Sequence, residues 1–554
     1  MIFPLIVALA VCNGESISTI DIRSHPPSFD GAAAEINAKA TELTGVHFAT
    51  TRGDVVRAYL LFAAGDKCTE EAVRESVRLL RAQSFIATAV IRVIPAGPGQ
   101  VRVQVDVVDE FPLIAAIRVR NSALSGVLLG SRNLQGNGLY LTGSIDRGFA
   151  YPTAFGLRAV QFGAFGRPAT VLLDAMRGSH GNRVIVEASE PFLTELRRNA
   201  MHLSVGMING LNTLLQPTGH EVALYARRAA WDIGAVRRIG VAAPGRTVGM
   251  LGGVLFGEDT RTAGDLVIVA DTGLVDSPDS VLVSRYHAVG NAHVAVVAGV
   301  RKIRYTRVSG FNSVNANEDV AEGVQLGALA GPSVWASRGA SDIFMATDFY
   351  AGSGDAQDLV TLRVTGEVRA NHESRRWDGV VGSARLAWYT ANTDNRTTVV
   401  TLDGGILQSL AFPAQLTFRD AEGGVRGFGG ASAAGGMRLV GRVEHRILTR
   451  VITSRADFAG ALFADAGKLW AGDAPYGVES PVRAAVGFSL LGAYPVHSKR
   501  TYRLDLAFPI NPERGGSRIE FRISSADRTM DRANEPRDIA SRRSGALPAA
   551  LLRW

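Results

Sequence analysis

The sequence contains only two cysteines among its 554 residues, Cys12 and Cys68. So few cysteines exclude a disulfide framework, and their spacing matches no metal site. We therefore expect no bound metal, and we expect Cys68 to be a small packed side chain.

Long apolar runs are missing after the first dozen residues, although hydrophobic residues make up 46% of the chain. A membrane-spanning helix needs about 20 mostly apolar residues, so the sequence argues against an α-helical membrane protein. Basic runs are missing too, because the 59 Lys and Arg residues are interleaved with 52 acidic ones. The net charge of +7 therefore gives no basic patch, and we expect no nucleic-acid partner.

Catalytic motifs are also absent. The sequence has no Gly-x-Ser-x-Gly, no His-Glu-x-x-His and no phosphate-binding Gly-rich Lys loop, and its ten histidines form no cluster. We therefore predict that the protein is not an enzyme and uses no cofactor.

The first residues suggest export. Residues 1–12 are apolar and include Ala8-Leu9-Ala10, the small-x-small pattern of a signal-peptide cleavage site. No Lys or Arg precedes the apolar stretch, so a buried strand is the alternative. Residues 13–45 are polar and mixed, and Pro26-Pro27 interrupts any regular element, so we expect an irregular lead-in segment.

A small α+β domain is predicted over residues 46–112. The pattern indicates a short strand at His47–Thr50, a helix, a second helix capped by Thr69, and strands at Ile86–Ile94 and Val101–Val107. The two helices can cover a three-stranded sheet with one open edge.

An open sheet edge can bind an extended segment of another chain through backbone hydrogen bonds. A structural spacer is the alternative interpretation. The candidates for the binding edge are Val101, Val103, Val105 and Val107.

Residues 137–525 form a long series of alternating segments separated by turn residues. In one of them, Ile519, Phe521 and Ile523 share a face and charged residues share the other. A soluble sandwich shows the same alternation, but nearly 400 residues of it favour a closed transmembrane antiparallel β-barrel. At about 24 residues per strand and turn, roughly 16 strands fit, with apolar side chains toward lipid. The fold class is therefore mainly β, with residues 113–136 as a linker before the barrel.

Two motifs stand out in this region: Val425-Arg426-Gly427-Phe428, and Phe463, Asp465 and Gly467 forty residues later. They resemble the hallmark segments of the BamA/TamA-type family, bacterial surface antigens with polypeptide-transport-associated (POTRA) domains and a 16-stranded barrel. The resemblance implies a loop folded into the lumen, whose Arg426 meets the inner wall at Phe463 and Asp465. Such a buried guanidinium needs an acidic or aromatic partner, and glycines permit the close approach.

The resemblance covers nearly the whole chain. Residues 133–138, 441–446 and 503–509 follow the family's order, and residues 47–108 resemble one POTRA domain. The chain departs from the family in having a single POTRA domain and a basic tail, residues 526–554, after the last strand. We expect this tail to be periplasmic and disordered.

The family implies a place in the bacterial outer membrane, with the POTRA domain in the periplasm. It also implies a function in inserting or translocating proteins, in which the POTRA edge binds an extended client and the barrel seam acts on it. The implied partners are outer-membrane lipid, an unfolded or extended client polypeptide, and periplasmic or lipoprotein accessory subunits. Secretion, lipid handling and a passive pore are the alternatives.

Overall fold

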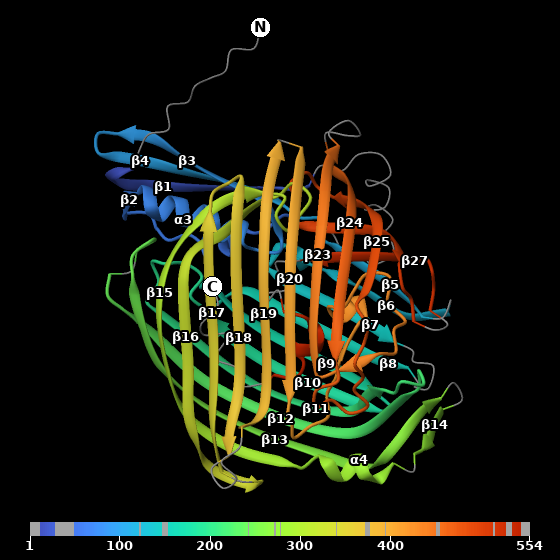
Figure 1. Cartoon of the computed structure of the whole chain (residues 1–554). Helices are drawn as coiled ribbons and strands as arrows, with labels where there is room; N and C mark the ends of the chain where they lie inside the picture. Colours follow the sequence, from blue (N-terminus) through green and yellow to red (C-terminus); the bar gives the residue numbers. More distant parts are fainter. Residues whose placement is uncertain are drawn as a thin grey trace.

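The chain has two structural parts, a small N-terminal α+β region and a large antiparallel sheet of about 20 strands curled into a barrel shape (Figure 1). The mainly β fold with a small α+β region before it is therefore confirmed. Within the described residues, no helix has the length and hydropathy of a membrane span. The computed structural model describes residues 12–27, 49–120, 123–146, 153–241, 243–270, 273–277, 279–339, 341–371, 377–393, 395–449, 455–513, 516–527 and 535–543.

The N-terminal region is built on a four-stranded sheet with the strand order β2-β1-β4-β3. The predicted second helix is confirmed, and the side chain of Thr69 caps it by accepting a hydrogen bond from the backbone N–H of Ala72 at 3.3 Å. The two strands predicted after it are confirmed as well. The elements are β1 (Asn13–His25), α2 (Gly53–Arg57), β2 (Lys67–Thr69), α3 (Glu70–Arg81), β3 (Ile86–Gly97) and β4 (Gln100–Asp109).

The expected irregular lead-in is wrong for residues 13–25, which form β1 and pair in parallel with β4. The register shifts between Ile17 and Thr19, so the core residues Ile17 and Ile20 are three positions apart. This bulge breaks the period of two by which a strand is recognised in a sequence. The expected strand at His47–Thr50 lies partly outside the described residues, and Ala49 and Thr50 are not in a strand.

The proposed client edge is also placed differently. β4 pairs with β1 on one side and with β3 on the other, so it lies inside the sheet, and β2 and β3 are the outer strands. The sequence pattern missed this because β1 was not recognised. The four valines of β4 are buried in the core of the region: Val101, Val103, Val105 and Val107.

The two cysteines form a disulfide, Cys12–Cys68, with Cα atoms 5.0 Å apart. The expectation that the cysteines form no disulfide is therefore wrong, whereas Cys68 is buried as expected. Pairing of β1 with β2, with Asn13 opposite Thr69, brings the two cysteines together. Cys12 thus belongs to the folded region, while the rest of the expected signal peptide, residues 1–11, lies outside the described residues.

The large sheet is formed by strands that pair in sequence order, and β27 stands next to β5 in that order. β14 is a four-residue strand, and β13 also pairs directly with β15. The strands are β5 (Leu113–Arg120), β6 (Ala123–Ser131), β7 (Leu139–Asp146), β8 (Ala154–Ala164), β9 (Ala169–Gly178), β10 (Gly181–Glu190), β11 (Asn199–Leu215), β12 (Glu221–Ile239), β13 (Val248–Ala270), β14 (Gly273–Asp276), β15 (Val289–Ser309), β16 (Asn317–Arg338), β17 (Asp342–Gly354), β18 (Asp358–Asn371), β19 (Trp377–Thr393), β20 (Arg396–Gln408), β23 (Met437–Thr449), β24 (Asp457–Trp470), β25 (Arg483–Ala493), β26 (Arg500–Pro509) and β27 (Glu520–Asp527).

The strand count exceeds the expected 16, and residues 113–136 are not a linker, because they contain β5 and β6. The sequence of β5 begins Leu-Ile-Ala-Ala-Ile and lacks the alternation of apolar and polar residues that indicates a strand. For this reason the sequence pattern placed the start of the sheet at residue 137 and not at Leu113. The short helices η1 (Leu134–Gly136) and α4 (Ser280–Arg285) lie in its connections.

The polarity of the large sheet is inverted relative to a soluble protein. On β24, Leu462 is 66% exposed on the outer face, whereas Asp465 is 2% exposed on the inner face. The same holds on β27, where Phe521 and Ile523 are 60% and 75% exposed. Buried ion pairs lie on the inner face beside apolar clusters, and large apolar side chains also cover the outer face.

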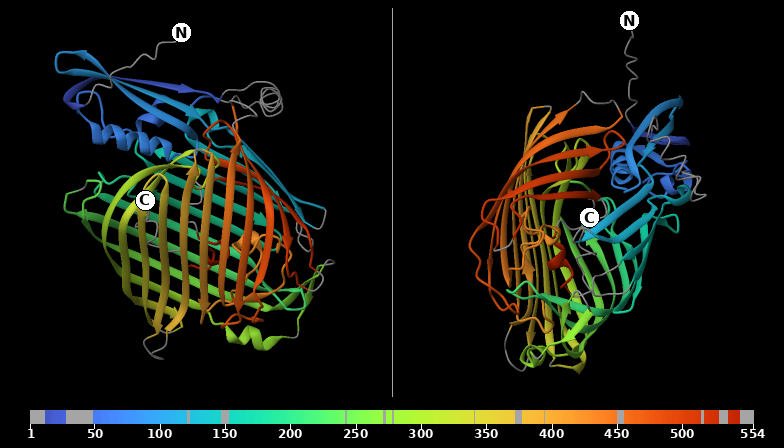
Figure 2. Two further views of the ribbon diagram at one scale, coloured as in Figure 1. Left: turned by 45° about the horizontal axis from the view of Figure 1, so that its top comes forward. Right: turned by 90° about the vertical axis from the view of Figure 1, so that its right-hand side faces the viewer.

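Two segments fill part of the interior of the sheet (Figure 2). The first is the connection between β20 and β23, residues 409–436, which we call the interior loop; it contains β21 (Leu416–Thr417), η2 (Asp420–Glu422) and β22 (Ala434–Gly435). The second is residues 535–543, which contain α5 (Arg537–Ala540). The expectation of a disordered tail is therefore wrong for these nine residues, because buried Ile539 packs against the loop. The other residues of the expected tail, except 526 and 527 of β27, lie outside the described ones.

Candidate functional site

The interior loop crosses from one side of the large sheet to the other. It leaves β20 and returns to β23, yet Gln415 receives a hydrogen bond at 2.7 Å from the backbone N–H of Leu215, at the end of β11. Arg419 forms an ion pair with Glu221 at the start of β12, at 3.1 Å. Because β11 and β12 are many strands away from β23 in the strand order, the loop is anchored at two distant places.

The structure brings together the three residues that sequence reasoning selected as a constellation. The guanidinium of Arg426 binds the carboxylate of Asp465 in a bidentate manner, with Nε–Oδ2 2.7 Å and Nη2–Oδ1 2.6 Å. Its Cζ atom lies 3.7 Å from the centre of the Phe463 ring. A planar guanidinium suits both contacts at once, because its edge donates hydrogen bonds while its face stacks on the ring.

Glycines make this close approach possible. A Cβ atom at Gly467 would lie 2.8 Å from a methyl group of Val425, and Gly427 adopts a φ of +86°. On β25, Gly487 is paired with Phe463, and a Cβ there would lie 2.5 Å from the ring. Gly467 and Gly487 thus leave room in the sheet for the loop tip, and larger residues at these two positions would displace the tip.

Phe428, the last residue of the loop motif, lies in an apolar cluster. Its ring centre is 6.1 Å from that of Phe418, and Val425 is buried in the same cluster. The tip is therefore held by apolar packing on one side and by the ion pair of Arg426 on the other.

Sequence reasoning missed the second acidic partner of Arg426. Glu444 on β23 accepts a hydrogen bond from Nη1 of Arg426 at 2.7 Å, and it also pairs with Arg446 and Arg503 at 2.6 Å each. Alternating charges along β23 and β26 were visible in the sequence, but the side on which they meet follows from the strand order. Arg426 thus belongs to a buried network of several charges, and removing one member leaves others uncompensated.

A cavity of about 530 Å³ lies beside this network in the interior of the sheet. Residues of both signs surround it, including Arg385, Asp403, Arg442 and Asp505. Among the described residues, no group of three or more His, Cys, Asp or Glu side chains is arranged to hold a metal ion.

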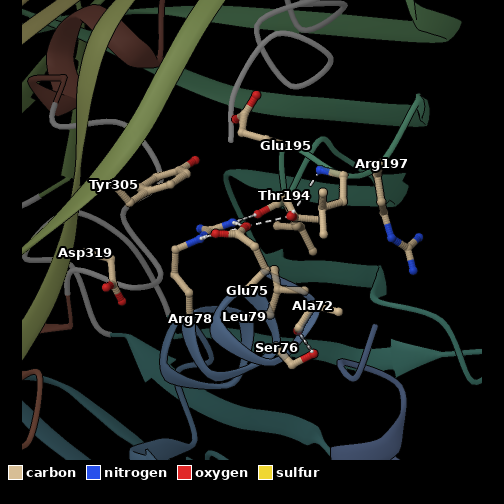
Figure 3. Close-up of polar contacts among 12 residues, drawn as sticks. Ala72, Glu75, Ser76, Arg78, Leu79, Thr194, Glu195, Arg197, Tyr305 and Asp319 are labelled. Carbon is tan, nitrogen blue, oxygen red and sulfur yellow. Dashed lines mark hydrogen bonds and ion pairs between the residues drawn. The ribbon is translucent and has the colours of Figure 1, made fainter. Parts of the chain in front are cut away.

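The N-terminal region is fixed against one end of the large sheet through α3 (Figure 3). Glu75 accepts a hydrogen bond from Thr194 at 2.6 Å, and Arg78 pairs with Glu75 at 2.9 Å. Arg78 also donates to the carbonyl of Leu193, and its Cζ lies 3.9 Å from the centre of the Tyr305 ring. These contacts join α3 to the β10–β11 turn and to β15.

Arg81, one turn further along α3, pairs with Asp319 of β16 at 2.6 Å. Burial raises the pKa of the Glu75 carboxyl, but the adjacent guanidinium of Arg78 and the hydrogen bond from Thr194 outweigh this and hold the pKa below its usual value. Glu75 is therefore charged at neutral pH, and α3 is held by charged, largely buried contacts.

The covalent link between the two parts is also buried. Asp109 accepts hydrogen bonds from the backbone N–H and the hydroxyl of Thr51, both at 2.7 Å, and Asn133 donates to that hydroxyl at 2.7 Å. The next residue, Glu110, accepts a hydrogen bond from Ser498 at 2.6 Å. Burial raises the pKa of Asp109 to about 6 and also raises that of Glu110.

The chain matches no family model. A comparison with curated proteins likewise finds no match. Among solved structures it is similar to BamA from Haemophilus ducreyi lacking POTRA domains 1–3, with 12% identity and a TM-score of 0.40 over 92% of this chain and 85% of that one. It is also similar to CdiB from Escherichia coli (11% identity, TM-score 0.45, 92% and 75%) and CdiB from Acinetobacter baumannii (11%, 0.41, 93% and 74%). At this level the similarity assigns no function.

Proposed function

We propose that the protein is an outer-membrane β-barrel that assists the insertion or translocation of proteins, with its N-terminal region acting as a periplasmic POTRA domain. The observation that carries this proposal is the inverted polarity of the large sheet. Its outer face carries large apolar side chains on successive strands, and its inner face carries buried ion pairs beside apolar clusters. An apolar outer surface of this extent is suited to lipid and not to water.

Closure of the sheet is part of the proposal. Lipid offers no hydrogen-bond partner for the backbone, so a spanning sheet needs β27 to pair with β5. These two strands are neighbours in the strand order. The seam between them is where the proposed action on a client takes place.

The N-terminal region supplies a candidate surface for an extended client, on β3 rather than on β4. β3 is an outer strand of its sheet, and within the described residues it pairs with β4 alone. Val90 and Ile94 of β3 are 46% and 36% exposed. An outer strand with exposed apolar side chains can add an extended segment by strand pairing.

The first experiment measures heat-modifiable gel mobility of outer-membrane fractions from the native host, combined with proteolysis of intact cells. A folded barrel runs faster before heating, and its periplasmic domain is protected from added protease. A protein that shows no mobility shift and is recovered in the soluble periplasm would contradict the proposal.

The client surface is tested by photo-crosslinking. A photoreactive residue at Val90 or Ile94 should capture extended polypeptides, whereas the same group at Arg74, which is exposed on α3, should not. Equal capture from both positions would remove β3 from the proposal but leave the barrel intact.

A further inference from the structure

The segment of residues 535–543, which we call the C-terminal segment, packs against the inner face of the large sheet. Asp538 forms an ion pair with Arg438 of β23, with distances of 2.5 and 3.0 Å, and both side chains are buried. The neighbouring Ile539 is fully buried in the apolar cluster of the interior loop. The segment therefore combines a charged and an apolar anchor in two adjacent residues.

The other end of the segment is anchored on different strands. Arg543 pairs with Glu367 of β18 at 3.1 Å and with Glu535, which in turn accepts a hydrogen bond from Ser383 of β19 at 2.5 Å. Glu367, Glu535 and Arg543 therefore each have a partner of opposite charge, as a specific buried binding site requires.

Contacts also reach the far side of the interior. Arg228 of β12 donates to the carbonyls of Ser541 and Arg543, at 3.1 Å each, and Arg542 donates to Asn212 of β11 at 2.7 Å. β11 and β12 are well separated from β18, β19 and β23 in the strand order. The segment thus bridges opposite walls of the large sheet.

The wall leaves room for the side chains of the segment. A Cβ atom at Gly405 of β20 would lie 2.5 Å from the Cδ1 atom of Ile539. At Gly423 in the interior loop, a Cβ would lie 2.6 Å from Pro536. Two glycines therefore form recesses that the C-terminal segment fills, in addition to the polar contacts.

We infer that this inner surface is a peptide-binding site whose resident ligand is the chain's own C-terminal segment, and that the bound segment closes the interior together with the interior loop. The ligand chemistry is a short segment with an acidic residue beside a buried aliphatic one and an arginine five residues after that acid. The C-terminal segment and the interior loop pack in one apolar cluster, so release of the segment also loosens the loop. This inference rests on the proposed function, because a closed interior matters only for a barrel in a membrane.

The test compares two aspartate substitutions at adjacent positions of the full chain. Ile539→Asp places a carboxylate in the apolar recess, whereas Ala540→Asp places it on an exposed residue. In planar bilayers, Ile539→Asp should give several-fold higher conductance than the unchanged chain, and Ala540→Asp should not. A synthetic peptide with the natural sequence of residues 535–545 should lower the conductance of Ile539→Asp again, while a scrambled peptide should have no effect.

Equal conductance of both variants, or a natural peptide that blocks no better than the scrambled one, would overturn the inference. If Ile539→Asp does not fold, as shown by a lack of heat-modifiable mobility, Asp538→Asn is compared with Ala540→Asp instead. Asp538→Asn removes only the negative charge that faces Arg438. An unchanged chain that neither shifts in the gel nor enters bilayers contradicts the proposed function itself. If the unchanged chain and all variants enter bilayers and conduct equally, only the inference about the C-terminal segment is contradicted.

Discussion

The N-terminal region and the large sheet use the same alternation of apolar and polar residues in opposite directions. On β4, the alternating valines are buried and Arg102 lies on the surface. On β24 and β27, Leu462, Phe521 and Ile523 lie on the outer face, and the charge of Asp465 is buried on the inner face. The period of two thus identifies a strand with two unlike faces, but it does not say which face meets the core.

The difference lies in what each face meets next. In the N-terminal region, α3 covers the valine face, so burial of apolar area drives folding in the ordinary way. In the large sheet, the interior loop and the C-terminal segment bring matching charges to the inner face, and we propose that the outer face meets lipid. The two parts should therefore respond in opposite ways to the same substitution.

The largest effect is expected from arginine in the core of the N-terminal region. Val103→Arg buries an unpaired charge in a fully buried position, which should destabilise that region by about 5 kcal/mol or more and expose it to protease. Leu490→Arg on the outer face of β25 should leave the detergent-folded chain intact and weaken bilayer insertion by about 2–4 kcal/mol. Limited proteolysis in detergent separates the two, and equal damage from both would refute the contrast.

Arg426→Ala should have the next largest effect, because it leaves Asp465 and Glu444 buried without their shared partner. We expect a loss of about 3–5 kcal/mol and a more conductive interior. Arg304→Ala is the control, since this arginine also pairs with a glutamate, Glu322, but is 68% exposed. Denaturation midpoints and single-channel conductance are the measurements; if Arg426→Ala behaved like Arg304→Ala, the loop would not be held by its ion pair.

Loss of the Cys12–Cys68 disulfide should affect the N-terminal region alone. Cys68→Ser is expected to lower its free energy of unfolding by about 2–4 kcal/mol, because the bond closes a long loop in the unfolded chain. Adding reductant to the unchanged chain should produce the same loss and should not change the variant further. Urea-dependent proteolysis of the region measures this, and a similar shift in the stability of the large sheet would show that the two parts unfold together.

The smallest effect concerns pH. The folded-state pKa of Asp109 is raised to about 6, so its contribution to stability is complete below its unfolded pKa and is lost as the pH rises through 6. Asp109→Asn should remove this dependence and stabilise the junction by about 2–3 kcal/mol at pH 7.5, with little change at pH 4. Asp54→Asn, at an exposed carboxylate, is the control. An unchanged pH profile in Asp109→Asn would remove Asp109 as its source.

Local patterns predicted the elements well but not their partners. The helix capped by Thr69 and the strands that became β3, β4 and β27 follow from periodicity and turn residues alone. The contact between Arg426 and Asp465 was predicted from two motifs that resemble those of the BamA/TamA-type family. The disulfide, the inner position of β4 and the folded C-terminal segment depend on long-range pairing, to which no local pattern points.

Neither β1 nor the folded C-terminal segment has a local pattern that predicts it. The bulge in β1 removes the period that would have identified a strand, and with it the neighbour of β4. Residues 535–543 are polar and basic, which is typical of disorder in water. Inside a charged interior the same composition becomes complementary, because Arg438 and Glu367 supply the opposite charges.

Fluorescence quenching with brominated lipids measures whether the outer face of the large sheet meets lipid. One variant keeps Trp388, which is 47% exposed on the outer face of β19, as its single tryptophan; the other carries Trp388→Phe with Tyr389→Trp, which moves the indole to the buried inner face. In reconstituted vesicles, we predict strong quenching of the first variant and weak quenching of the second. Equal quenching of both variants, or no quenching of the first, would show that the outer face of the large sheet does not meet lipid.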